Sequence, residues 1–266
     1  MIHGLSNSFL YTAKHIVTHW DFNGSIITWC GTGFFIGKET DIYLITNRHV
    51  VELPYSHPEY TGATLIDFKC EGFEYAKEGE VPSQYSSITI ANVNEFTFHD
   101  NKYNDIACLK NPKCDMTKGT SHSISLPIGY SMLATKEKLD SKLTVCDTIA
   151  YPGFPQWYDK KNSTPIFRMG TVASDPRFNY SCNITDPDAD RIAYEGFSSG
   201  GASGSPVFAI QKGFQTGPSI SAPEDFYREV MLVGINAGHY PSDEGHSGIS
   251  YFYKSSAIIE IIDSIP

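Results

Sequence analysis

The chain has 266 residues, with 30 acidic and 20 basic side chains, a formal net charge of −10 and 41% hydrophobic residues. This hydrophobic content is that of an ordinary globular protein, and the length suits one large all-β unit or two smaller domains. The acidic residues are spread along the chain without a cluster of Lys and Arg, which argues against a nucleic-acid partner.

The sequence also argues against membrane insertion and export. No apolar run reaches the roughly 18–20 residues that a spanning helix needs. Residues 1–20 lack a cationic stretch followed by an apolar one, so they do not resemble a signal peptide. The six cysteines show no C-x-x-C spacing, which argues against a zinc knuckle or a dithiol site. We therefore expect a soluble, cytoplasmic protein without a membrane partner.

Most of the chain has the pattern of short antiparallel strands. Apolar and polar residues alternate, and the segments end in Gly, Pro, Asn or Asp. Strands are predicted, in chain order, at 25–37, 41–51, 86–100, 104–110, 142–154, 164–174, 191–197, 204–210 and 229–238. Residues 111–140 are polar and weakly periodic, and we expect them to connect two groups of strands. This pattern favours two β-barrels side by side.

Only the end of the chain, residues 255–263, is expected to be helical. Ser255 or Ser256 can cap this segment, and Ile258, Ile259 and Ile262 fall on one face.

A glycine-rich stretch at residues 198–208, SSGGASGSPVF, contains a candidate nucleophile. Ser203 stands among glycines, and small neighbours would let a substrate carbonyl approach its hydroxyl and leave backbone N–H groups free for a developing oxyanion. A serine hydroxyl is a poor nucleophile unless a base takes its proton and a third group orients that base. The alternative interpretation is a soft surface turn.

A histidine and a carboxylate stand where a fold could deliver them to Ser203. His49 closes the apolar strand IYLITNRHVV, and Asp105 lies at the start of NDIACLK. Taken alone, His49 could be a structural histidine at a strand end and Asp105 a simple strand cap. The order His, Asp, Ser sets aside the α/β-hydrolases, which run Ser, Asp, His, and the subtilisins, which run Asp, His, Ser.

Four segments together resemble the trypsin-like (chymotrypsin-fold) serine peptidases. They are FFIGKETDIYLITNRHVV, NDIACLK, GASGSPVF, and the pair VGINAGHY and HSGISYFY within 233–253. The nearest likeness is to bacterial members such as the glutamyl endopeptidases and the high-temperature-requirement proteases. The resemblance implies an all-β fold of two antiparallel six-stranded β-barrels, with the active site in the cleft between them and a short C-terminal helix. Residues 1–125 would form the barrel that carries His49 and Asp105, and residues 126–266 the barrel that carries Ser203 and the substrate pocket.

The same resemblance implies a role for each residue. Ser203 would be the nucleophile, His49 the general base and acid, and Asp105 the group that orients His49. The backbone N–H groups of Gly201 and Ser203 would form the oxyanion hole. The substrate pocket would be formed by Phe197, Ser198, Asn236, Gly238 and Gly248. No Asp or Glu stands at the pocket base, so a neutral or apolar side chain is expected before the scissile bond.

We therefore expect a serine endopeptidase that hydrolyses peptide bonds through an acyl-enzyme on Ser203. Its partner would be a protein or peptide substrate, and no metal or organic cofactor is needed. The alternative is a catalytically silent trypsin-like module that binds a peptide or partner protein; hydrolysis of small esters is a third possibility. His239 and His246, with Asp243 and Glu244, could bind a metal, although a polar loop at the cleft rim is the expected interpretation.

Overall fold

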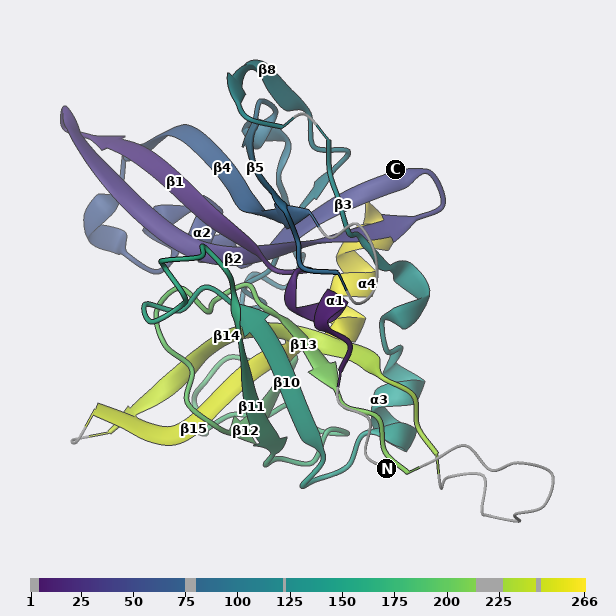
Figure 1. Cartoon of the computed structure of the whole chain (residues 1–266). Helices are drawn as coiled ribbons and strands as arrows, with labels where there is room; N and C mark the ends of the chain where they lie inside the picture. Colours follow the sequence, from purple (N-terminus) through teal and green to yellow (C-terminus); the bar gives the residue numbers. More distant parts are fainter. Residues whose placement is uncertain (1–4, 75–79, 122, 214–226, 243–244) are drawn as a thin grey trace.

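The computed structural model describes residues 5–74, 80–121, 123–213, 227–242 and 245–266. Strands predominate and form two sheets, drawn one above the other in Figure 1, with the C-terminal helix α4 (Ser255–Ser264) between their ends. The predicted all-β, chymotrypsin-like fold with a short C-terminal helix is confirmed. Within the described residues, no helix has the length and apolar character needed to cross a membrane.

The second half of the chain contains the closed six-stranded barrel that the sequence predicts. Its strands, in the order in which they pair, are β10 (Thr148–Gly153), β11 (Ile166–Val172), β12 (Arg191–Glu195), β15 (Gly245–Lys254), β14 (Met231–Ser242) and β13 (Pro206–Ala209). Fully buried side chains such as Tyr151, Tyr194, Val207 and Phe252 fill its interior. The barrel is therefore a packed core and no channel.

The first half forms a larger sheet than the six-stranded barrel that the resemblance implies. Its nine strands are β1 (Lys14–Phe22), β2 (Ser25–Lys38), β3 (Asp41–Thr46), β4 (Thr64–Glu74), β5 (Gln84–Ile90), β6 (Thr97–Phe98), β7 (Ala107–Lys110), β8 (Cys114–Gly119) and β9 (Ile128–Gly129). The short strands β6 and β8 add to the two ends of the path, and β9 pairs with β2 in parallel. These additions account for the difference.

The long strand β2 organises this sheet. Its first part, up to Gly33, pairs with β1, and its second part, from Gly33 to Lys38, pairs with β3. β9 lies beyond residue 125 yet pairs with β2. The division into domains at residues 1–125 and 126–266 stays a prediction.

Several elements depart from the sequence-based prediction. The strands predicted from the sequence do not include β1, β4, β8, β9 or β15. The helix α3 (Lys136–Lys142) occupies part of the predicted connector, with the Thr135 hydroxyl accepting a hydrogen bond from the Lys138 N–H. Two further helices of one turn are α1 (Asn7–Leu10) and α2 (Arg48–Val51), and 3₁₀ turns lie at Leu53–Tyr55, Pro58–Tyr60, Val93–Glu95 and Tyr130–Met132.

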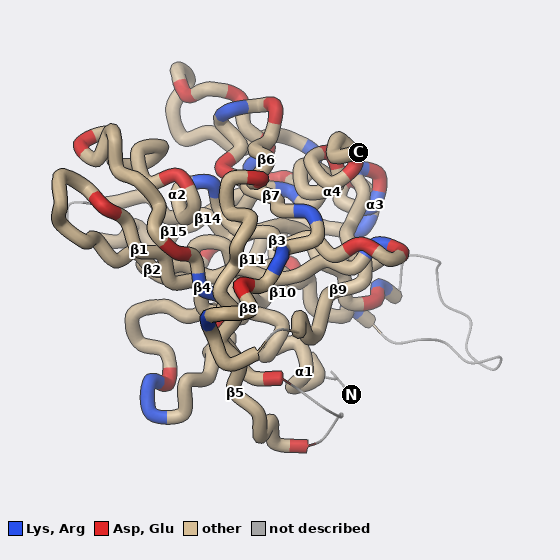
Figure 2. The backbone as a smooth tube through the Cα atoms, turned by 90° about the horizontal axis from the view of Figure 1, so that it is seen from above, with Lys and Arg blue, Asp and Glu red and all other residues tan. Residues whose placement is uncertain are grey.

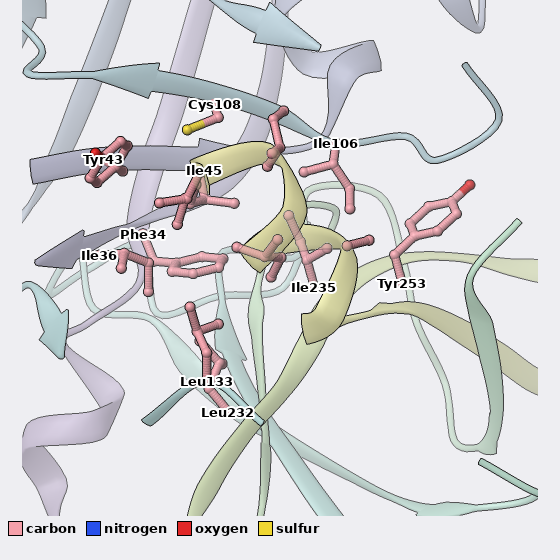
Figure 3. Close-up of a cluster of buried hydrophobic side chains, with 14 of the residues drawn as sticks. Phe34, Ile36, Tyr43, Ile45, Ile106, Cys108, Leu133, Leu232, Ile235 and Tyr253 are labelled. Carbon is pink, nitrogen blue, oxygen red and sulfur yellow. The ribbon is translucent and has the colours of Figure 1, made fainter. Parts of the chain in front are cut away.

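A hydrophobic cluster joins the two sheets through α4 (Figure 3). Phe34 and Ile45 come from the first sheet, Leu232 and Ile235 come from the barrel, and Ile258 lies on α4. Burial of an aliphatic side chain of this size contributes about 1.5–3 kcal/mol relative to exposure. The cluster therefore fixes the two sheets relative to one another, which any site at their seam requires.

Candidate active site

His49 lies at the seam of the two sheets, in α2, directly after β3. The predicted strand 41–51 ends at Thr46, because residues 48–51 form one turn of helix. The preceding Asn47 is fully buried, and its Nδ2 donates to the backbone carbonyl of Asp105 at 2.6 Å. This bond ties the chain around His49 to the segment that enters β7.

Both carboxylate oxygens of Asp105 are used by the same histidine. Oδ2 lies 2.6 Å from His49 Nδ1, and Oδ1 accepts the His49 backbone N–H at 2.9 Å. Burial lowers the pKa of His49, but the charge of Asp105 and its hydrogen bond outweigh that effect and raise the pKa above 6.5. With Nδ1 committed to Asp105, Nε2 is left as the ring nitrogen that can exchange a proton.

Ser203 lies in the tight turn between β12 and β13. Its hydroxyl donates to the Ala237 carbonyl at 3.0 Å, and no hydrogen bond from it to His49 is found within the described part of the chain. Gly201 and Gly204 flank it with φ of +90° and +88°, which only glycine adopts without strain. A Cβ at Gly204 would stand 1.9 Å from the Thr32 carbonyl oxygen. The turn therefore rests directly on the backbone of β2.

Thr32 of β2 holds this turn with both its backbone and its side chain. Its N–H donates to the Ser203 carbonyl at 2.8 Å. Its hydroxyl donates to the Gly201 carbonyl at 2.7 Å and accepts the Phe154 N–H at 3.1 Å. Thr32 is fully buried. One residue of the first sheet thus positions the backbone on both sides of Ala202.

One cleft of about 610 Å³ brings the three predicted residues together. It is lined by Trp29, His49, Tyr55, Ser56, His57, Asp105, Arg191, Ser198, Ser199, Gly200, Ser203, Ala237, Gly238, His239, Tyr251 and Tyr253. Both sheets contribute, with the first supplying the histidine and the carboxylate and the barrel supplying the serine turn. The arrangement can deliver a hydroxyl, an imidazole and a carboxylate to one bound molecule.

The residues predicted for the substrate pocket separate into two groups. Ser198 and Gly238 line the cleft, whereas Phe197, Asn236 and Gly248 do not. Phe197 is 62% exposed, and its ring packs on His246 with centroids 4.8 Å apart. Phe197 and Gly248 instead border a shallow depression on the barrel surface.

Asn236 is fully buried behind the wall of the cleft. Its Nδ2 donates to the Ser198 hydroxyl at 3.0 Å and to the Ala202 carbonyl at 2.9 Å, and its Oδ1 accepts the Tyr194 hydroxyl at 2.7 Å. All of its side-chain polar atoms are therefore used inside the protein. These contacts show that Asn236 supports the Ser203 turn.

The cleft also contains residues that no sequence motif identified. Tyr55 and Arg191 line it outside any recognisable motif. Tyr251 and Tyr253 line it from the segment HSGISYFY, which resembles the family but gave neither tyrosine a role. Arg191 reaches the cleft because it pairs with Tyr253 between β12 and β15. Strand register alone decides this placement, and nothing in the local sequence signals it.

The two histidines considered for metal binding lie on neighbouring strands. The rings of His239 and His246 stack, with centroids 4.4 Å apart. In the portion of the chain that the structure describes, no three His, Cys, Asp or Glu side chains group as metal ligands. Asp243 and Glu244 lie outside the described residues.

Comparison with known proteins identifies similar sequences and folds. Residues 31–217 match the sequence profile described as the trypsin-like peptidase domain. A search of curated proteins finds no match. Among solved structures, the HtrA-type protease AlgW with a tripeptide is similar, with a TM-score of 0.52 and 15% identity over 98% of this chain and 64% of that one. At this identity the likeness concerns the fold alone, and this chain spans less than two thirds of that protein.

The Thr32 hydroxyl is expected to stabilise the seam. Thr32→Val keeps the side-chain shape but leaves the Gly201 carbonyl and the Phe154 N–H, both held only by that hydroxyl among the described residues, without their partner. We expect the free energy of unfolding to fall by about 1–3 kcal/mol, measured by urea denaturation. Thr32→Ser keeps the hydroxyl and serves as the control. Equal stability of the Val and Ser variants would contradict this role.

Proposed function

This chain belongs to the family of trypsin-like peptidase domains, and on that basis we propose that it is a serine endopeptidase acting through an acyl-enzyme on Ser203. The observation that supports this most strongly is that Ser203 shares one cleft with the hydrogen-bonded pair His49 and Asp105. Protein or peptide chains are the proposed substrates. The cytoplasmic location expected from the sequence stays a prediction, as does the bacterial origin that the likeness to bacterial members of the family suggests.

In the proposed reaction, His49 Nε2 takes the Ser203 hydroxyl proton as Oγ attacks the carbonyl carbon of a peptide bond. Asp105 holds Nδ1 and stabilises the imidazolium that forms. His49 then gives the proton to the leaving amine, and the acyl group stays on Ser203. A water molecule, deprotonated by the same imidazole, releases the acyl group as a carboxylic acid. The Ser203 hydroxyl must first leave the Ala237 carbonyl, which rotation about its side-chain bond allows.

Two backbone N–H groups in the serine turn support an oxyanion hole. Among the described residues, the N–H groups of Gly201 and Ser203 donate to no acceptor. The N–H groups of the neighbouring residues Ala202 and Gly204 both donate backbone hydrogen bonds. The two free donors are the ones that would stabilise the negative oxygen of the tetrahedral intermediate.

Anchored carbonyls orient these donors. In a trans peptide the N–H points away from the C=O of the same peptide. The Gly200 carbonyl accepts the Gln156 N–H at 3.1 Å, and the Ala202 carbonyl accepts Asn236 Nδ2 at 2.9 Å. These bonds hold the Gly201 and Ser203 N–H groups in place before substrate binds. We propose that residues 126–266 supply this hole and Ser203, while residues 1–125 supply the base.

A second candidate function is a catalytically silent module that binds a peptide or partner protein. The observation that favours it is the Ser203 hydroxyl, which donates to Ala237 and makes no hydrogen bond to His49 in the described structure. The intact set of His49, Asp105 and two free N–H donors favours the peptidase.

Ser203→Ala is expected to lower the turnover of peptides by roughly 10⁴–10⁶-fold, because the nucleophile is lost. Cleavage of a peptide library, followed by mass spectrometry, measures both the activity and the preferred residue before the scissile bond. Ser205→Ala is the matched control: this serine lies in the same turn, and its buried hydroxyl makes no hydrogen bond to a described residue. Unchanged cleavage by the Ser203 variant, or equal loss in both, overturns the proposal.

The pH dependence of kcat/KM is expected to reflect His49. The imidazole must be neutral to accept a proton, so activity rises with pH through a pKa that Asp105 holds above 6.5. Asp105→Asn removes the charge, so the acid limb should move to lower pH while the maximal kcat falls by about 10⁴-fold. If the acid limb of the pH profile lies at the same pH in Asp105→Asn as in the native protein, the assignment of His49 as the base is contradicted.

A further inference from the structure

The cleft carries one permanent positive charge, and no residue of the proposed reaction uses it. Arg191 is the only Lys or Arg among the lining residues, and Asp105 is the only Asp or Glu. Both oxygens of Asp105 already bind His49. Arg191 and Asp105 therefore give the cleft lining a formal net charge of zero with neutral histidines, although the chain as a whole carries −10. Figure 2 shows the acidic residues spread over loops and strands of the whole molecule.

Aromatic rings hold the Arg191 side chain at the end of the cleft that contains Asp105. Its guanidinium carbon lies 5.1 Å from the ring centroid of Tyr251 and 5.7 Å from that of Tyr253. Tyr55 lines the same end, and its pKa is raised to about 12, by burial first and then by Asp105. Stacking of this kind fixes the plane of a guanidinium and leaves its edge available for hydrogen bonds.

The guanidinium lacks an acidic partner within the protein. No Asp or Glu among the described residues forms an ion pair with Arg191, and its buried Nε has no hydrogen-bond partner there. By contrast, Arg48, which stacks on the cleft residue Tyr55, binds Glu52. A partly buried arginine without a carboxylate is costly unless a ligand completes it.

We infer that Arg191 forms a subsite for a carboxylate of the substrate, so that the cleft selects peptides with an Asp or Glu near the scissile bond. This inference rests on the proposed function for its biological meaning, but the binding step does not depend on catalysis. The planar guanidinium donates two parallel N–H groups to a carboxylate, and the neighbouring tyrosine hydroxyls add further donors. The substrate side chain that enters the space beside Ser198 and Gly238 is a separate determinant of specificity, and the neutral or apolar side chain expected there is unaffected by this inference.

Binding to the Ser203→Ala variant tests the subsite without requiring turnover. Fluorescent peptides of one neutral sequence carry Glu or Gln at each position in turn, and each pair is also made with a free and an amidated C-terminus. We expect one internal position at which Glu binds about 10–100-fold more tightly than Gln, as charge-assisted hydrogen bonds allow. Arg191→Gln should abolish this difference. Arg191→Glu should reverse the charge preference, so that a peptide with Lys at that position binds more tightly than the same peptide with Gln.

Arg177→Gln is the matched control, because it removes the same charge from an exposed arginine that pairs with Asp175 outside the cleft. Equal affinity for Glu and Gln at every position overturns the subsite, as does a preference that survives in Arg191→Gln. A dependence on the free C-terminus alone overturns the assignment to a side chain. If Glu-selective binding is observed but the native protein cleaves nothing, the proposed function fails and the subsite stands.

Discussion

The contact between the turn that carries Ser203 and the backbone of β2 is the constraint on which the cleft depends. Thr32 binds the Ser203 and Gly201 carbonyls, and Gly204 leaves no room for a side chain between the two segments. The contact joins the two sheets at the point where His49 follows β3. The hydrophobic cluster around α4 fixes the same interface on its other side, so the geometry of the cleft follows from packing.

Preorganisation is the property that these contacts produce. His49 is oriented by two bonds to Asp105, and the free N–H groups of Gly201 and Ser203 are oriented through anchored carbonyls. Asn236 takes part in this support from behind the wall of the cleft. Donors fixed before the substrate arrives need no reorganisation as charge develops, which is why such groups contribute strongly to acyl transfer. The hydroxyl of Ser203 is the one group that must turn.

The residues of the proposed triad could be predicted from the sequence because each stands in a local motif and their order along the chain matches a known family. The pocket was less predictable. Whether Phe197 points outward and Asn236 inward depends on how the turn before Ser203 packs, and Arg191 reaches the cleft only through its pairing with Tyr253. The strand predictions were incomplete for a related reason: β8 and β9 are short strands that form through pairing with neighbours, and their sequences carry no strong period of two.

The central claim is that Ser203 is a nucleophile activated by His49 across the seam of two sheets. The most direct test is intact-protein mass spectrometry after reaction with a fluorophosphonate, which labels activated serines irrespective of the natural substrate. The account predicts one adduct per chain, located on Ser203, absent in Ser203→Ala and formed far more slowly in His49→Ala. An adduct that forms equally in the native chain and in both variants would contradict it.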